Sequence, residues 1–202
     1  MIDGVGVGSA SRIPAEAFAT LTHWLPSNDE FARPLIALAT VDVQGRPDVR
    51  NVLLSEYSPA GFFVHTDERS RKMADVTANP NAAFSIAWPA DFRQLTVQAT
   101  AERATPEEEA LAYSRRSRYL QLLAWLNSAE FAELPQPQRE AEWAAFDAAH
   151  PDGTLTPPPT WAGLLLRPTR ITFWRGGALA ASTRLEYTLA ASGTWRTSIL
   201  PG

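Results

Sequence analysis

Residues 61–88, with the sequence GFFVHTDERSRKMADVTANPNAAFSIAW, decide the fold. Residues 61–66 and 82–88 are mostly apolar and rich in side chains that favour strands. Between them, residues 70–78 lack β-branched alternation and end at Asn79-Pro80, as a short helix does. The segment therefore predicts a strand, a short helix and a second strand.

Further strands are predicted on both sides of this segment. Upstream, residues 35–42 and 49–57 flank the turn signal Gly45-Arg46-Pro47, which predicts a hairpin. Downstream, strand-like runs occur at residues 94–101, 163–167, 171–175, 184–188 and 195–199.

A single block of helices is predicted between these strands, at about residues 105–150. Thr105 is the expected N-cap, with Pro106 at the first helical position and Glu108 as the capping-box partner. Helical sequence is interrupted at residues 134–137 and closed by three prolines at 157–159. Short strands with one inserted helical block predict a mainly β, α+β fold, an antiparallel barrel or sandwich rather than a doubly wound sheet.

Composition limits the function classes. The chain has 202 residues and contains no cysteine, which excludes disulfides and zinc ribbons. Its net charge of −4 is not typical of a nucleic-acid binder. No apolar run is long enough to cross a membrane. Residues 1–14 do not resemble a signal peptide, so we expect a cytoplasmic protein in which residues 1–30 form a partly flexible arm.

The usual catalytic signatures are absent from the sequence. The three histidines, His23, His65 and His150, lie far apart and lack metal-ligand spacing, so no metal is expected. There is no G-x-G-x-x-G, Walker or G-x-S-x-G motif, and nothing marks one serine as a nucleophile.

Two basic clusters are candidate anion sites. Ser70-Arg71-Lys72 stands at the start of a predicted helix, where backbone N–H groups and two cations can meet a phosphate; the alternative is a solvated pair of charges. Lys72 is the one lysine among 18 basic residues. Arg115, Arg116 and Arg118 could clamp a phosphate or carboxylate, or could form a charged helix face opposite the acidic residues 107–109.

Five stretches, in order, resemble one family: GRPDVRNVLLSEY at 45–57, the segment 61–88, RQLTVQATAER at 93–103, TFWRGG at 172–177 and RLEY at 184–187. From about Phe31 to its end the chain is similar to the pyridoxine/pyridoxamine 5'-phosphate oxidase family of flavoproteins. The resemblance implies that residues 31–202 form one split β-barrel domain of the antiparallel Greek-key type. It also implies a homodimer with one FMN per subunit at the dimer interface.

The resemblance implies a set of cofactor-binding residues. They are Arg50, Asn51, Val52, Leu53, His65, Thr66, Ser70, Arg71, Lys72, Gln94, Trp174 and Arg184. Thr66, Arg71 and Lys72 are implied to hold the phosphate end of FMN, whereas the C-terminal strands close the site over the ring system.

The substrate half departs from the family pattern. In the family, a lysine, a tyrosine, an arginine and a serine grip the substrate phosphate. Here Ser55 stands in place of the lysine, Ala112 in place of the tyrosine and Leu120 in place of the serine, so that only the arginine, Arg116, remains. Tyr113 is one residue away from the position of the missing tyrosine. The family motif R-L-H-[DE]-R appears as residues 180–184 without its first arginine and its histidine, and a Gln-Ser pair appears as Ala129-Glu130. The implied substrate-binding residues are Ser55, Tyr113, Arg116, Ala180 and Ser182.

Three functions are compatible with these residues. The first is an FMN-dependent oxidase that acts on a small cyclic or aromatic molecule and passes electrons to oxygen; family relatives in phenazine biosynthesis oxidise reduced tricyclic acids. The second is a divergent pyridoxine/pyridoxamine 5'-phosphate oxidase of vitamin B6 metabolism. The third is a flavin- or ligand-binding protein without turnover. A small-molecule substrate and a second copy of the chain are the expected partners, with no nucleic acid and no membrane among them.

Overall fold

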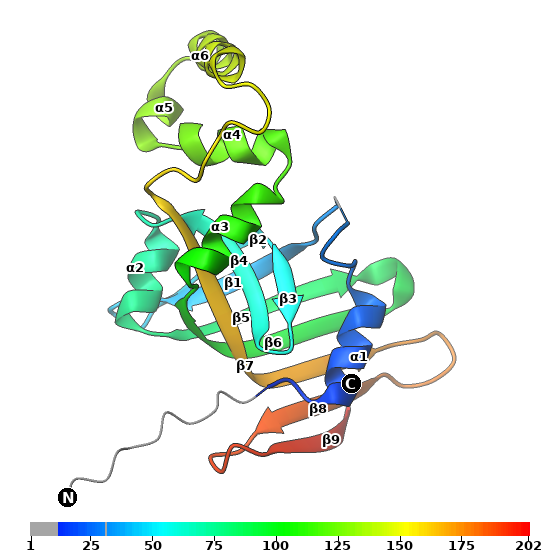
Figure 1. The fold of residues 1–202 in the computed structure, drawn as a ribbon. Helices are drawn as coiled ribbons and strands as arrows, with labels where there is room; N and C mark the ends of the chain where they lie inside the picture. The colour runs from blue at the N-terminus through cyan, green and yellow to red at the C-terminus, as the bar shows by residue number, and fades with distance from the viewer. Residues whose placement is uncertain (1–11, 31) are drawn as a thin grey trace, which may run out of the picture.

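An antiparallel sheet curled into a half-barrel forms the body of the molecule in a computed structural model that describes residues 12–30 and 32–202. The strand order is β2-β1-β5-β6-β7-β4-β3, and β8 and β9 continue the sheet from the far end of β7 (Figure 1). The elements are α1 Ala15–Trp24, β1 Leu35–Val41, β2 Pro47–Leu53, β3 Glu56–Ser58, β4 Gly61–Asp67, α2 Arg71–Ala78, β5 Asn81–Trp88, η1 Pro89–Asp91, β6 Arg93–Arg103, α3 Pro106–Ser114, α4 Arg118–Leu126, α5 Ala129–Glu133, α6 Gln136–Ala149, β7 Trp161–Arg175, β8 Thr183–Leu189 and β9 Trp195–Pro201. The predicted α+β barrel class is confirmed.

The predicted hairpin is present, but its second strand divides. β1 and β2 pair from Leu35 opposite Leu53 to Val41 opposite Pro47, around a turn in which Gly45 has a φ of 78°. The expected strand at 49–57 ends at Leu53 because the chain then changes partner: the Ser55 N–H donates to the Phe63 carbonyl, and β3 pairs with β4. This switch places Ser55 in the connection between β2 and β3.

One long strand replaces two predicted ones. β7 runs for 15 residues through the expected break between 163–167 and 171–175. Its first half pairs with β4, its second half with β8, and β6 pairs with it along most of its length. The pairing with β6 shifts register at Gln98/Ala99, opposite Pro168, because proline has no N–H to donate to a regular ladder.

Helix α1 lies inside the stretch that the sequence assigned to an arm. Ala17, Leu21 and Trp24 on one of its faces are buried in the main hydrophobic cluster, and the Trp24 ring meets the Phe173 ring edge-on at 5.2 Å between centroids. No helix was expected there. The predicted flexibility of residues 1–11 lies outside the described residues, and the domain boundary at residue 30 stays a prediction.

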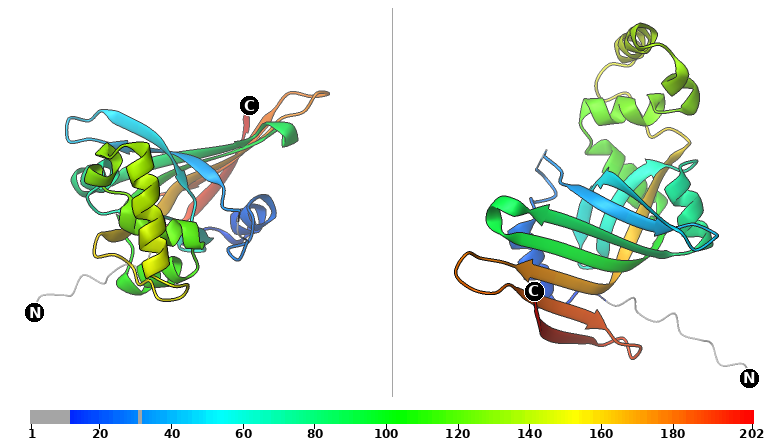
Figure 2. Two further views of the ribbon diagram at one scale, coloured as in Figure 1. Left: turned by 90° about the horizontal axis from the view of Figure 1, so that it is seen from above. Right: turned by 180° about the vertical axis from the view of Figure 1, so that it is seen from behind.

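The helical block matches its predicted position and starts as expected. The Thr105 side chain accepts from the Glu108 N–H, and the Glu108 carboxylate accepts from the Thr105 N–H, which completes the capping box. Helices α4 to α6 form a lobe that projects beyond the end of the half-barrel (Figure 1 and the right-hand view of Figure 2). No residue of α6 is buried, so this lobe adds little to the main core.

Candidate functional site

A cradle of hydroxyl and ammonium groups lies where β4 gives way to α2. Lys72 Nζ donates to Thr66 Oγ1 at 2.7 Å, and Thr66 Oγ1 donates to Ser70 Oγ at 3.3 Å. Ser70 is the N-cap residue of α2, yet its side chain makes no capping bond. Burial lowers the pKa of Lys72, and the nearby Arg50 guanidinium lowers it further. A half-buried cation beside two hydroxyls and a helix N-terminus fits a phosphate.

Arg50 and Arg71 lie beside the cradle, and both are in ion pairs. Arg50 contacts Asp48 at 2.8 Å and the buried Asp75 at 3.4 Å, and it donates to Thr40 Oγ1 at 2.7 Å. Arg71 contacts Asp48 at 3.3 Å. The two arginines therefore share one carboxylate.

His65 is neutral and packed beside the cradle. Its ring stacks on that of Trp161 at 5.2 Å between centroids and 5° between planes, and neither ring nitrogen has a hydrogen-bond partner among the described residues. Burial lowers the pKa of His65 to about 3, and the Arg116 charge acts in the same direction. Gly163 makes room for the ring, because a Cβ there would lie 3.0 Å from His65 Nε2. His65 therefore brings no positive charge to a phosphate.

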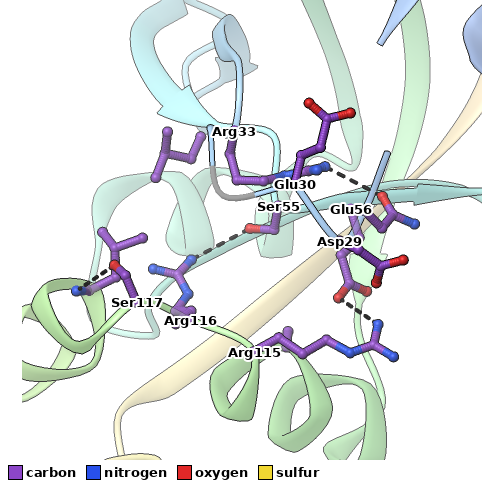
Figure 3. A pocket seen from close by; sticks show the side chains of 12 residues that line it. Asp29, Glu30, Arg33, Ser55, Glu56, Arg115, Arg116 and Ser117 are labelled. Atoms are coloured by element: carbon purple, nitrogen blue, oxygen red, sulfur yellow. Dashed lines mark hydrogen bonds and ion pairs between the residues drawn. The ribbon is translucent and has the colours of Figure 1, made fainter. Parts of the chain in front are cut away.

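A cleft of about 250 Å³ opens between α3, α4 and the loop before β1 (Figure 3). Its lining includes Ser55 and Arg116 together with Ala112 and Leu120, the two apolar residues that stand at positions of the family's polar grip. The lining residues are Asn28, Asp29, Glu30, Arg33, Leu53, Ser55, Glu56, Ala112, Arg115, Arg116, Ser117 and Leu120. The positions that align with the family's substrate grip thus meet in one cavity.

Arg116 is the main electrostatic feature of this cleft. Its Nη2 donates to Ser55 Oγ at 3.5 Å, and its guanidinium lies 4.4 Å from the centroid of the Trp161 ring. No carboxylate of the described residues lies within 4.0 Å of it. Burial lowers the pKa of Arg116 to about 10, so the group stays charged at neutral pH without a counter-ion. Such a cation attracts an anionic ligand.

The remaining arginines of the cluster are in ion pairs. Arg118 contacts Asp147 at 2.6 Å and so ties α4 to α6, and Arg115 contacts Glu56 at 3.4 Å. Tyr113 is only 1% exposed; its hydroxyl donates to the Gln121 carbonyl and its ring packs on Trp161. Tyr113 is therefore buried in the core and is absent from the lining of this cleft, and its contact with a substrate stays a prediction.

Several cleft residues escaped the sequence reasoning. Arg33 donates to the Ser27 carbonyl at 2.6 Å and the Leu54 carbonyl at 3.2 Å, which fixes the loop before β1 against the strand switch. This contact brings Asp29 and Glu30 to the cavity. They carry no motif, and the tertiary contacts made by Arg33 and by Asn28, which bonds to the Tyr57 backbone, hold their loop there.

The other predicted flavin residues form a second, distant group. Gln94 pairs with Trp174, and Trp174 pairs with Arg184, on three neighbouring strands. Ala180 and Ser182 lie in the connection just before β8. Thr66 pairs with Ala162 at the other end of β7, twelve residues before Trp174, which is roughly 40 Å along a strand. On β2, Arg50 belongs to the network beside the cradle, Asn51 is exposed, Val52 packs against the core and Leu53 lines the cleft.

The sheet and its helices form a split barrel, and similarity to known proteins identifies its family. The model of the pyridoxamine 5'-phosphate oxidase family matches residues 28–153, more than half of the chain, so the chain belongs to this family. A pyridoxine/pyridoxamine 5'-phosphate oxidase of Anaeromyxobacter dehalogenans is 36% identical over 81% of this chain and 82% of its own length.

Two solved structures share the fold. PhzG from Burkholderia lata, in complex with tetrahydrophenazine-1-carboxylic acid, superposes with a TM-score of 0.75 at 23% identity over 92% of this chain and 88% of that one. A pyridoxamine 5'-phosphate oxidase-related, FMN-binding protein of Nostoc punctiforme gives 0.70 at 20% identity over 95% and 99%. In the part of the chain that the structure describes, no helix is long and apolar enough to cross a membrane and no group of side chains could hold a metal ion.

Proposed function

We propose that this protein is an FMN-dependent oxidase whose substrate is a small cyclic or aromatic molecule carrying a carboxylate, with oxygen as the electron acceptor. Membership of the family and the FMN-binding relative support the cofactor. The observation that carries the substrate class is Arg116: a partly buried cation with no carboxylate within 4.0 Å among the described residues, in a cleft whose apolar lining residues are Leu53, Ala112 and Leu120.

The arrangement of the flavin residues favours a site shared by two copies of the chain. The cradle and the Gln94–Trp174–Arg184 group lie at opposite ends of β7, and one FMN cannot span that separation. In a two-fold dimer the same surface serves both partners, so the cradle of one chain can face the second group of the other. Ala180 and Ser182 would then reach the substrate from the partner chain.

Each group of residues has a task that its chemistry fits. When bound, FMN supplies a ring that accepts a hydride from the substrate and passes electrons on. Lys72, Thr66 and Ser70 would hold the flavin phosphate through charge-assisted and hydroxyl hydrogen bonds. Arg116 and Ser55 would orient the substrate by its anionic group, while Ala112 and Leu120 exclude water from that end of the cleft.

The polar inventory of the cleft favours a carboxylate over a phosphate. Arg116 and Ser55 remain where the family pattern supplies further donors, and each missing charge-assisted bond costs on the order of 1.5–3 kcal/mol of binding energy. Arg118 is not among the lining residues of the cleft and is paired with Asp147, and Arg115, which does line it, is paired with Glu56. The tetrahydrophenazine-1-carboxylic acid in the PhzG complex is a molecule of the proposed class.

The runner-up is a divergent oxidase of pyridoxine or pyridoxamine 5'-phosphate, which the names of the curated relatives favour. The experiment that separates the two is an anaerobic visible spectrum of the FMN-loaded protein. Bleaching by a reduced tricyclic carboxylic acid but not by pyridoxine 5'-phosphate supports the proposal, and the reverse pattern establishes the runner-up. If neither compound nor a wider panel of reduced cyclic acids bleaches the flavin, the protein is a binding protein without turnover.

A further inference from the structure

One carboxylate oxygen lies between two of the cations beside the cradle. Asp48 Oδ2 is 2.8 Å from Arg50 Nη2 and 3.3 Å from Arg71 Nη1. Asp48 and Arg50 are two residues apart on β2, so their side chains leave the same face of the strand. A bridging position between two guanidinium groups is also the position that an oxygen of a bound phosphate would take.

Arg50 does not depend on Asp48 for a counter-ion. The buried Asp75 already lies 3.4 Å from Arg50 Nη2, and Thr40 accepts a hydrogen bond from Arg50 Nη1 at 2.7 Å while donating one to Asp75 at 2.6 Å. This internal network holds the arginine from the side of the core. Arg71, by contrast, has a side chain that is 80% exposed, and its pair with Asp48 is a surface contact of small energy.

We propose that Asp48 competes with the phosphate of FMN for Arg50 and Arg71, and so weakens cofactor retention. This inference rests on the proposed function, because it requires FMN to occupy the cradle. The cluster holds three cations, Arg50, Arg71 and Lys72, and two carboxylates, Asp48 and Asp75, a net charge of +1. A phosphate monoester carries a charge of about −1.5 to −2 at neutral pH.

Removing the charge of Asp48 raises the cluster to +2, which matches the dianion. Asp48→Asn keeps the size of the side chain and an oxygen that can still accept from both arginines. For charges a few ångströms apart near a surface, we expect FMN to bind about three- to tenfold more tightly to this variant. Riboflavin lacks the phosphate, so its affinity should not change. Added salt should weaken FMN binding more steeply in the variant than in the wild type.

The experiment is a fluorescence titration of the flavin-free full-length chain with FMN and with riboflavin. Asp42→Asn is the matched control, since Asp42 lies in the same hairpin and pairs with Arg46 at 2.9 Å, away from the cradle. Asp48→Ser is a second variant, and melting temperatures check that each variant is folded. Tighter FMN binding with unchanged riboflavin binding, in Asp48→Asn and not in Asp42→Asn, supports the proposal.

Two results overturn the proposal while leaving the flavin site intact. Weaker or unchanged FMN binding in folded Asp48 variants would show that the carboxylate orients the two arginines instead of competing for them. An equal gain in affinity for FMN and riboflavin would show that the Asp48 carboxylate affects binding of the flavin ring rather than of the phosphate. If the wild type does not bind FMN, or if Lys72→Met does not change FMN affinity, the cradle is not the FMN phosphate site. Competition between Asp48 and that phosphate is then refuted as well.

Discussion

Replacing Lys72 by methionine should remove most of the affinity for FMN while leaving the fold intact. The ammonium makes a 2.7 Å hydrogen bond to Thr66 Oγ1, and among the described residues no carboxylate lies within 4.0 Å of it. A charge-assisted bond to the phosphate is worth about 1.5–3 kcal/mol, which predicts roughly 10- to 150-fold weaker binding.

The stability of the protein should change little in this variant. Burial lowers the pKa of Lys72, which means that the folded protein holds the charged form at a disadvantage, and methionine fills similar space without that penalty. The measurements are a fluorescence titration with FMN and a melting curve of the flavin-free protein.

Arg69→Met is the control for a general loss of positive charge. Arg69 lies three residues before Lys72, but its guanidinium makes a 2.7 Å ion pair with Asp67 and is more than half exposed. It should lose no more than about twofold in FMN affinity, as expected for an exposed ion pair. Equal losses in the two variants, or a Lys72→Met protein that binds FMN as tightly as the wild type, would refute the reasoning about the cradle.

Three further predictions concern the cleft, the buried histidine and the dimer. Arg116→Met should raise the KM for an acidic substrate by roughly 10- to 150-fold with a smaller change in kcat, because one charge-assisted bond orients the substrate; an unchanged KM contradicts the role of Arg116. His65 has a pKa of about 3 in the folded protein and about 6.5 when unfolded, so protons bind the unfolded chain preferentially and the free energy of unfolding should fall, by about 3–5 kcal/mol, as the pH drops from 6.5 to 3. Urea unfolding at several pH values should show that His65→Phe loses this part of the pH dependence; a variant with the same dependence as the wild type would show that other groups cause it. Finally, mixing Lys72→Met and Arg184→Met chains should restore tight FMN binding to about a quarter of the sites, since a random hybrid contains one intact shared site; no recovery after verified subunit exchange contradicts a site shared between chains.

Local signals in the sequence were sufficient for the elements that depend on neighbouring residues. The capping box of Thr105 and Glu108, the hairpin turn at Gly45 and the cradle at Ser70–Lys72 are all set by a few consecutive side chains. Contacts between distant residues were not predictable in the same way. The continuity of β7 through Pro168 depends on the register shift in the facing strand β6, and the burial of α1 depends on aromatic residues far along the chain.

The candidate site shows the same division. The arginine cluster at 115–118 was visible in the sequence, but its members have three different environments: Arg115 pairs with Glu56, Arg118 pairs with Asp147, and Arg116 is partly buried without a carboxylate partner. The spacing of the three arginines along the chain cannot predict these environments, because the residues that pair with them lie in the loop at Ser55-Glu56 and in α6. Tyr113 was predicted to contact the substrate because it is one residue away from Ala112, the position that aligns with the family's tyrosine. One residue along an α-helix turns the side chain by about 100°, and Tyr113 is absent from the lining of the cleft.

Charge placement connects the cofactor site with the substrate site. Arg50 and Leu53 belong to the same strand, and Arg50 belongs to the network beside the cradle while Leu53 lines the cleft that holds Arg116. Among the arginines of the two sites, Arg50 and Arg71 carry a carboxylate counter-ion and Arg116 does not. An incoming flavin phosphate therefore meets an unpaired Lys72 but competes with Asp48 for Arg50 and Arg71, whereas a substrate anion at Arg116 meets no such competitor. We accordingly expect the substrate anion to be bound mainly through Arg116, and cofactor retention to respond to substitutions of the carboxylates on β2.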